Sequence, residues 1–115
     1  MKRINALFYK NSNGKEPVKE WLYTLSRDDM KTIGEDIRTV EYGFPIGMPV
    51  CRPLGDKLYE VRSDISDKQI ARVIFTIIDS YMVLLHGFIK KTQKTPKQDI
   101  EIAKNRAKEI RQWKR

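Results

Sequence analysis

The stretch that decides the fold runs from Ile70 to Ile89 and reads IARVIFTIIDSYMVLLHGFI. It holds two apolar runs that are rich in β-branched and aromatic residues, a composition typical of strands. Asp79 and Ser80 separate the runs, and two residues is the length of a tight hairpin turn. Neither run alternates cleanly between apolar and polar residues, which favours strands that are covered on both faces. The segment therefore predicts two buried strands, Ile70–Ile78 and Tyr81–Ile89.

Two further segments read as strands by the same criteria. Ile4–Tyr9 is a short apolar run closed by the turn-rich sequence NSNG, and Leu58–Ser63 precedes the hairpin. The stretch between Gly43 and Lys57 interleaves three prolines with three glycines, and we predict an irregular loop there.

Three helices complete the pattern. Pro17 suits the first turn of a helix, because its missing N–H is not needed there, and an apolar stripe begins at Val18. Ser26 predicts the N-cap of a second helix that ends near Gly43. Thr95 predicts the N-cap of the last helix, with Pro96 at its first position. The predicted fold class is α+β in the order β-α-α-β-β-β-α, with helices packed on a curved, mostly antiparallel sheet.

Length and composition limit the possible classes of protein. The chain has 115 residues, of which 40% are hydrophobic and 33% charged, and we predict one domain spanning residues 1–115. A single cysteine excludes an internal disulfide and a cysteine-rich zinc cluster. The start of the chain is too polar for a signal peptide, and no apolar run is long enough to cross a bilayer. We therefore expect a cytoplasmic protein without a membrane partner.

The positive charge is concentrated at the end of the chain. The sequence holds 23 Lys and Arg against 15 Asp and Glu, a net charge of +8. The segment from His86 to Arg115 holds ten basic and three acidic residues, so seven of the eight net charges lie there. Such asymmetry indicates a polyanionic partner, because phosphates attract lysine and arginine and release counterions. The alternative is a solvated helix face with excess lysine.

Several polar side chains stand where a buried sheet does not tolerate them without compensation. Arg62 ends one predicted strand, Arg72 lies inside the next, and His86 lies near the end of the last, followed by Lys90 and Lys91. If neighbouring strands pair, these side chains converge on one cationic surface with a single imidazole. The alternatives are ion pairs of the arginines with Glu60 or Asp64, and a histidine that is satisfied at the end of a core strand.

Such a surface suits the cleavage of a phosphodiester bond. Cleaving RNA without a metal requires a base for the 2′-hydroxyl proton, cations for the charge at phosphorus and an acid for the leaving oxygen. Arginine and lysine supply the cations, and histidine serves as acid or base. No set of His, Cys, Asp or Glu has metal-ligand spacing, and we expect neither a metal nor another cofactor. Cys51 reads as a chance surface or half-buried thiol, and Trp21 and Trp113 read as core residues on apolar helical stripes.

Three segments together resemble a known protein family. They are LGDKLYEVR from Leu54 to Arg62, RVIF from Arg72 to Phe75 and LLHGFIKKTQKTP from Leu84 to Pro96. They resemble the RelE/HigB-type toxins of bacterial toxin–antitoxin systems, in particular the phage-derived HigB-like branch. The resemblance covers nearly the whole chain, and it implies two N-terminal helices against a twisted antiparallel sheet.

The resemblance also implies an activity and the residues that carry it. The activity is ribosome-dependent cleavage of mRNA, with Arg62 and Arg72 holding the scissile phosphate and Lys90 and Lys91 as the basic pair. His86 matches the family motif. Some relatives use a tyrosine near the C-terminus as acid or base, but no tyrosine follows Tyr81 here. The general base and acid thus stay open between His86 and a lysine.

Partners and competing functions follow from the same reading. The expected partners are mRNA, the ribosome and a cognate antitoxin, which is often a helix-turn-helix repressor in such systems. The alternatives are a ParE-like toxin that inhibits DNA gyrase and a non-catalytic basic nucleic-acid-binding module. Exposed lysines on and near the last helix are expected to add non-specific attraction to RNA. The predicted RNA-binding residues are Lys57, Lys94, Lys97, Lys104 and Lys108.

Overall fold

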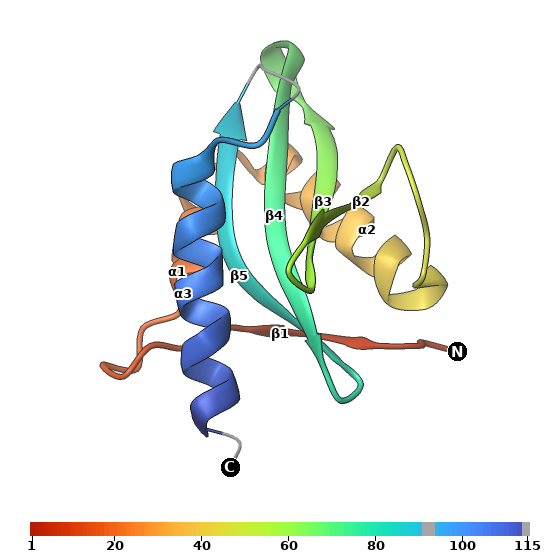
Figure 1. Ribbon diagram of the computed structural model, residues 1–115. Helices are drawn as coiled ribbons and strands as arrows, with labels where there is room; N and C mark the ends of the chain where they lie inside the picture. The colour runs from red at the N-terminus through yellow and green to blue at the C-terminus, as the bar shows by residue number, and fades with distance from the viewer. Residues whose placement is uncertain (91–93, 114–115) are drawn as a thin grey trace.

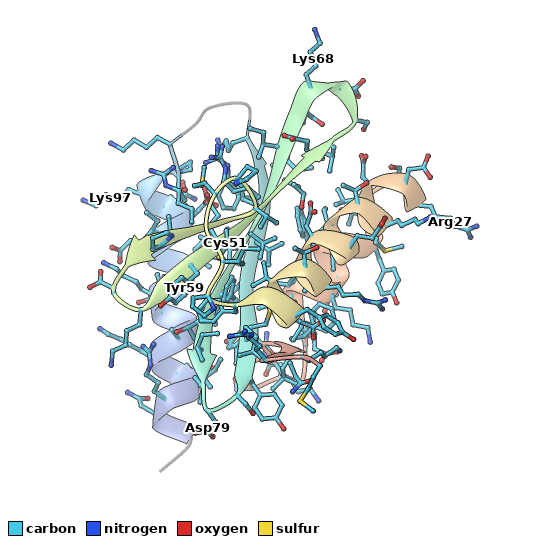
Figure 2. All side chains as sticks on the ribbon, turned by 90° about the vertical axis from the view of Figure 1, so that its right-hand side faces the viewer. Arg27, Cys51, Tyr59, Lys68, Asp79 and Lys97 are labelled. Atoms are coloured by element: carbon cyan, nitrogen blue, oxygen red, sulfur yellow. The ribbon has the colours of Figure 1, made fainter. Side chains whose placement is uncertain are left out.

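A five-stranded mixed sheet forms the middle layer of the computed structural model, which describes residues 1–90 and 94–113 (Figure 1). Helices α1 and α2 pack on one face of the sheet and α3 packs on the other, so that the sheet lies between α2 and α3 in Figure 2. The elements are β1 (Asn5–Phe8), α1 (Pro17–Tyr23), α2 (Arg27–Gly43), β2 (Cys51–Gly55), β3 (Leu58–Ile65), the 3-10 turn η1 (Ser66–Lys68), β4 (Gln69–Ile78), β5 (Tyr81–Lys90) and α3 (Lys97–Trp113).

The strand order is β1-β5-β4-β3-β2. β1 runs parallel to β5, and every other neighbouring pair is antiparallel. The α+β class, the three helices and the mostly antiparallel sheet are therefore confirmed. The predicted order is incomplete, because β2 is a strand in the segment that the prolines and glycines predicted to be an irregular loop. β2 is an edge strand, where Pro53 is tolerated, and its ladder with β3 is irregular between Pro53 and Gly55.

The helix boundaries follow local chemistry. Pro17 occupies the start of α1, and the Ser26 hydroxyl caps α2 by accepting a hydrogen bond from the Asp29 N–H. α2 ends at Gly43, as predicted. α3 begins at Lys97, later than Thr95 and Pro96 predicted, and the Thr95 hydroxyl instead bonds to a buried side chain on the sheet. Thr95 thereby fixes the chain just before α3 to β3.

Two apolar layers hold the fold together. The first lies between the sheet and helices α1 and α2 and includes Val18, Ile33 and Phe75. The second lies between the sheet and α3, where Ile74 and Leu85 pack with Ala103 and other residues. Small residues on the buried stripe of α3, Ala103 and Ala107, let the helix approach the sheet closely. Asp99 and Arg106 then reach polar groups of β5, and Arg111 reaches Thr76 on β4.

Candidate functional site

Arginines and a histidine from three strands share the face of the sheet that α3 covers. Arg62 on β3 lies directly opposite Arg72 on β4, and Arg72 lies opposite Phe88 on β5. In the next row Glu60 lies opposite Ile74, which in turn lies opposite His86. Residues two apart along a strand point to the same face. The sheet thus places Arg62, Arg72 and His86 on one face, with β4 between the strands of Arg62 and His86.

A β-bulge decides which face His86 joins. The β4–β5 ladder pairs Phe75 with Leu84 but Ile74 with His86, so that Leu85 is an extra residue on β5. In a regular strand His86 would share a face with Leu84, which packs towards α1 and α2. The bulge re-aims the side chain, which is a common role of bulges beside functional sites. The Leu85 carbonyl accepts a hydrogen bond of 2.7 Å from Nη1 of Arg106 on α3.

The arginines are organised around a buried carboxylate. Glu60 and Arg72 have no exposed surface. The Thr95 hydroxyl donates to Oε2 of Glu60 at 2.5 Å and accepts from Nη1 of Arg72 at 3.5 Å. Nε of Arg62 lies 3.9 Å from Oε1 of Glu60. The ion pair of Arg62 with Glu60, one of the two possibilities that the sequence left open, is therefore present.

The surroundings of Arg72 act on its charge in opposite directions. Burial lowers the pKa of Arg72 most, and Arg62 and Arg52 lower it further, whereas Glu60 raises it. A buried charge is expensive unless it is paired, so the Glu60 carboxylate is what lets Arg72 lie inside the sheet. One carboxylate faces three guanidinium groups, and the cluster as a whole keeps a positive charge that attracts an anion.

Burial also changes what Arg72 can do. Arg72 has no exposed surface, so its guanidinium is not accessible to a phosphate outside the sheet. The side chain of Arg62 remains 10% exposed, and a cleft of about 480 Å³ opens beside it, between α2 and the edge of β3. The residues that line the cleft are Thr32, Asp36, Pro49, Val50, Arg62, Asp64 and Ile70. Arg62 is the accessible member of this pair.

Arg52 is a member of the cluster that the sequence did not indicate. It lies on β2 directly opposite Glu60, and it is close enough to Arg72 to affect the pKa of that residue. Its side chain is half-buried. The signal was hidden because Pro53 and Gly55 make this segment read as a loop. As a strand, the segment places Arg52 on the same face as Leu54 and away from the buried Cys51.

His86 on β5 contacts an aspartate on α3, the helix that covers this face of the sheet. Its Nε2 lies 2.7 Å from Oδ1 of Asp99, in the first turn of the helix, and the imidazole stacks on the Phe88 ring at 5.5 Å between centroids. Both His86 and Asp99 are 16% exposed. The pair fixes the plane of the ring and leaves part of its edge open to solvent.

The lysines predicted to bind RNA or to act in catalysis lie on several elements around the cluster. Lys90, Lys94 and Lys97 are exposed near the N-terminal end of the helix, and Lys97 projects away from the sheet in Figure 2. Lys91 lies outside the described residues. Lys57 is exposed in the turn between β2 and β3, at the other end of the cluster face, and Lys108 is exposed further along α3.

Lys104 is tied down rather than extended into solvent. Its Nζ lies 3.0 Å from Oδ2 of Asp56 in the β2–β3 turn and 4.0 Å from Oε1 of Glu101. The hydrogen bond to Asp56 raises the pKa of Lys104. The expectation of a freely exposed lysine at this position is therefore corrected, because part of its charge is already compensated by Asp56.

One family model matches the chain, over residues 20–108, and it is described as "Phage derived protein Gp49-like (DUF891)". The match spans most of the chain. The protein belongs to the Gp49-like family. This family is known for toxins of toxin–antitoxin systems. No curated protein matches the chain.

The Gp49-like match includes every residue of the cluster. Arg52, Glu60, Arg72, Thr95 and Asp99 all fall inside residues 20–108, as do Arg62 and His86. β1 lies outside the matched range. The family region therefore coincides with the part of the chain that builds and supports the polar cluster.

Other candidates in the Gp49-like chain are structural. Cys51 is buried, and burial together with the Glu60 charge raises the pKa of its thiol to about 11, so the thiol is unreactive near neutral pH. Trp21 packs in the core between α1 and β5, whereas the side chain of Trp113 lies outside the described residues.

Residues 1–90 and 94–113 show neither a metal-binding cluster nor a membrane-spanning helix. No group of three or more His, Cys, Asp or Glu residues in them has the geometry to hold a metal ion. No helix within these ranges is both long enough and apolar enough to span a membrane.

Proposed function

We propose that the protein is the toxin of a toxin–antitoxin pair and that it cleaves mRNA on the ribosome, as a RelE/HigB-type endoribonuclease. The observation that carries the proposal is the arginine cluster of Arg52, Arg62 and Arg72 around Glu60, on the same sheet face as His86. Cations held by a rigid sheet suit the stabilisation of charge at phosphorus, because they need no reorganisation during the reaction.

The proposed reaction is an internal transfer at phosphorus. The 2′-oxygen of the ribose attacks the adjacent phosphorus, the new O–P bond forms and the bond to the 5′-oxygen breaks. A base takes the 2′-hydroxyl proton, and an acid gives a proton to the departing 5′-oxygen. The products are a 2′,3′-cyclic phosphate and a 5′-hydroxyl, and no metal is consumed or required by this balance.

The roles of the side chains follow from their exposure. Arg62 and Arg52 reach the surface of the cluster and are proposed to bind the scissile phosphate. Arg72 is a positioning residue, because it is buried and acts through Thr95 and Glu60 on the arrangement of the others. His86 is the proposed acid or base, and Lys90 is the nearest exposed lysine on the same strand.

Partners follow from the charge of the site. Exposed Lys94, Lys97 and Lys108 are proposed to add non-specific attraction to RNA or to the ribosome. A cognate antitoxin is proposed to neutralise the protein by placing an acidic segment over the arginine cluster, which would both occupy the phosphate site and block access of mRNA.

The proposal is tested by expressing the protein and by assaying it on programmed ribosomes. Expression without a partner should arrest bacterial growth, and the purified protein should cleave the mRNA to products with a 5′-hydroxyl end. Arg62→Ala should reduce single-turnover cleavage by about 10²-fold or more, the usual loss for one preorganised donor. Growth arrest with intact mRNA and inhibited DNA supercoiling would instead support the gyrase-inhibiting alternative.

A further inference from the structure

Asp99 occupies a position that the sequence did not link to the reaction. It stands on α3, thirteen residues after His86 in the chain, and its Oδ1 lies 2.7 Å from Nε2 of His86. The contact joins the first turn of α3 to β5 across the layer that also contains the arginine cluster. We infer that Asp99 is a positioning residue for His86, an inference that rests on the proposed function.

The chemistry of the contact limits the state of the imidazole. An ionised carboxylate only accepts hydrogen bonds, so of the two neutral tautomers of His86 the contact with Asp99 favours the one that carries its proton on Nε2. Proton exchange with a substrate then goes through Nδ1. In this tautomer Nδ1 is an acceptor, and we assign His86 as the general base for the 2′-hydroxyl. A carboxylate that orients a histidine in this way also stabilises the imidazolium that forms.

The surroundings of the ring support this role. Phe88 stacks against the imidazole, and Arg106 holds the backbone of the bulge at Leu85, the residue before His86. Arg72 is the diagonal neighbour of His86 on β4, since it lies opposite Phe88. His86 is therefore on the same sheet face as the arginine cluster and next to its buried member, which suits a base that acts on a ribose beside the bound phosphate.

A simpler role for Asp99 is electrostatic support of the helix. An acidic residue in the first turn of a helix is stabilising because it faces the positive end of the helix dipole. A test of the inference must therefore separate the loss of this charge from the loss of the contact with His86. Gln98 is exposed in the same turn and allows the charge to be restored one residue away.

The experiment measures cleavage and the imidazole proton in the same variants. Asp99→Asn keeps the shape of the side chain but offers an amide that can donate to Nε2 and favour the opposite tautomer. We expect single-turnover cleavage by the ribosome-bound protein to fall by about 10²-fold, the lower end of the contribution of a general base. Ribosome binding should stay within about twofold, because His86 and Asp99 do not contribute to phosphate attraction.

NMR of the ¹⁵N-labelled protein reports which imidazole nitrogen of His86 carries the proton. This signal would not change if Asp99 only supported the helix. The wild type should show a protonated Nε2 whose proton is protected from exchange with solvent, and Asp99→Asn should lose this signal. The double variant Gln98→Glu with Asp99→Asn restores the negative charge in the first turn of the helix, and its rate of cleavage should stay as low as that of Asp99→Asn. Glu101→Gln, an exposed change on the same helix, should leave the signal and the rate unchanged.

The outcomes separate the two claims. If the wild type cleaves no mRNA, the proposed function fails. If the wild type cleaves and Asp99→Asn is equally fast, or if Gln98→Glu restores the rate of Asp99→Asn, only the role of Asp99 is overturned. A wild-type imidazole that is protonated on Nδ1 would also overturn it.

Discussion

Arg62 and Arg72 are direct cross-strand partners on β3 and β4, on the face of the sheet that α3 covers. Like charges in this relationship destabilise an antiparallel pair. The pair persists because Glu60 lies within 3.9 Å of Arg62 and is linked to Arg72 through the Thr95 hydroxyl. The paired arginines cost stability, and the cluster keeps a net positive charge. Such a charge attracts an anion, which is the property that a phosphate-binding site requires.

Removal of the central carboxylate should show how much the cluster depends on it. Glu60→Gln leaves Arg72 buried without its counter-charge and leaves it opposite Arg62. Breaking a buried ion pair by removing one partner typically costs about 3–5 kcal/mol, so we expect a loss of that order in the free energy of unfolding. Urea denaturation followed by circular dichroism measures it.

The matched control for this change is Glu101→Gln on the exposed side of α3, which should alter the free energy of unfolding by less than about 0.5 kcal/mol. A loss below about 1 kcal/mol for Glu60→Gln would contradict the proposed role of Glu60 as the organiser of the arginines.

We expect Arg72 to contribute mainly to the free energy of unfolding and Arg62 mainly to the rate of cleavage. Arg72→Ala leaves a cavity at a buried site and removes one of the guanidinium groups that offset the Glu60 charge, and it should lower the free energy of unfolding by about 3 kcal/mol or more. Arg62→Ala removes a partly exposed side chain, and it should lower the rate of cleavage about 10²-fold with a smaller loss of stability.

Thermal unfolding and single-turnover cleavage, measured on both variants, check this separation. Arg62→Lys keeps the charge but not the fork of donors, and it should recover only part of the rate. Equal rates for wild type and Arg62→Ala at saturating protein would show that Arg62 is structural.

The bulge at Leu85 gives Arg106 a measurable role. Arg106→Met keeps the apolar stem of the side chain but removes the donor to the Leu85 carbonyl. An unsatisfied buried acceptor costs about 1–3 kcal/mol, and we expect a loss of that size in the free energy of unfolding. Cleavage should also fall, because the bulge aims His86. Gln112→Met, an exposed change on the same helix, is the control, and an unchanged cleavage rate for Arg106→Met would separate the bulge from the chemistry.

Gly87 is required by the packing of Trp21. A Cβ at position 87 would overlap Cε3 of the Trp21 indole, so that the ring or the strand would have to move. Gly87→Ala should therefore destabilise the protein by about 1–3 kcal/mol, the usual cost of overpacking. Gly34→Ala on the exposed side of α2 meets no neighbour within 4 Å and should instead stabilise by about 0.5–1 kcal/mol. Denaturation midpoints of the two variants that shift in the same direction would contradict this account.

Much of the fold was accessible from the sequence because local patterns and the tertiary structure agree. Ser26 and Gly43 mark the ends of α2 through capping and helix termination, and the run from Ile70 to Ile89 forms the predicted hairpin. Pro53 and Gly55 concealed β2, because edge strands accept residues that are excluded from central ones. Arg52 was missed for the same reason.

The candidate site was predictable in its membership but not in its arrangement. Arg62 and Arg72 share a face because they are paired across β3 and β4, and side chains at paired positions point to the same face of a sheet. The position of His86 depends on an extra residue at Leu85, and no pattern in the sequence marks a bulge there. The pairs His86–Asp99 and Thr95–Glu60 join residues on separate elements, so only the packing of α3 reveals them.

The most direct test of the central claim is single-turnover cleavage of mRNA on programmed ribosomes, with the ends of the products identified chemically. The account predicts that the wild-type protein cuts the message and leaves a 5′-hydroxyl end and a 2′,3′-cyclic phosphate, and that folded Arg62→Ala and His86→Ala each cut at least about 10²-fold more slowly. Uncut mRNA with the wild-type protein bound to the ribosome, or unchanged rates in both variants, would contradict it.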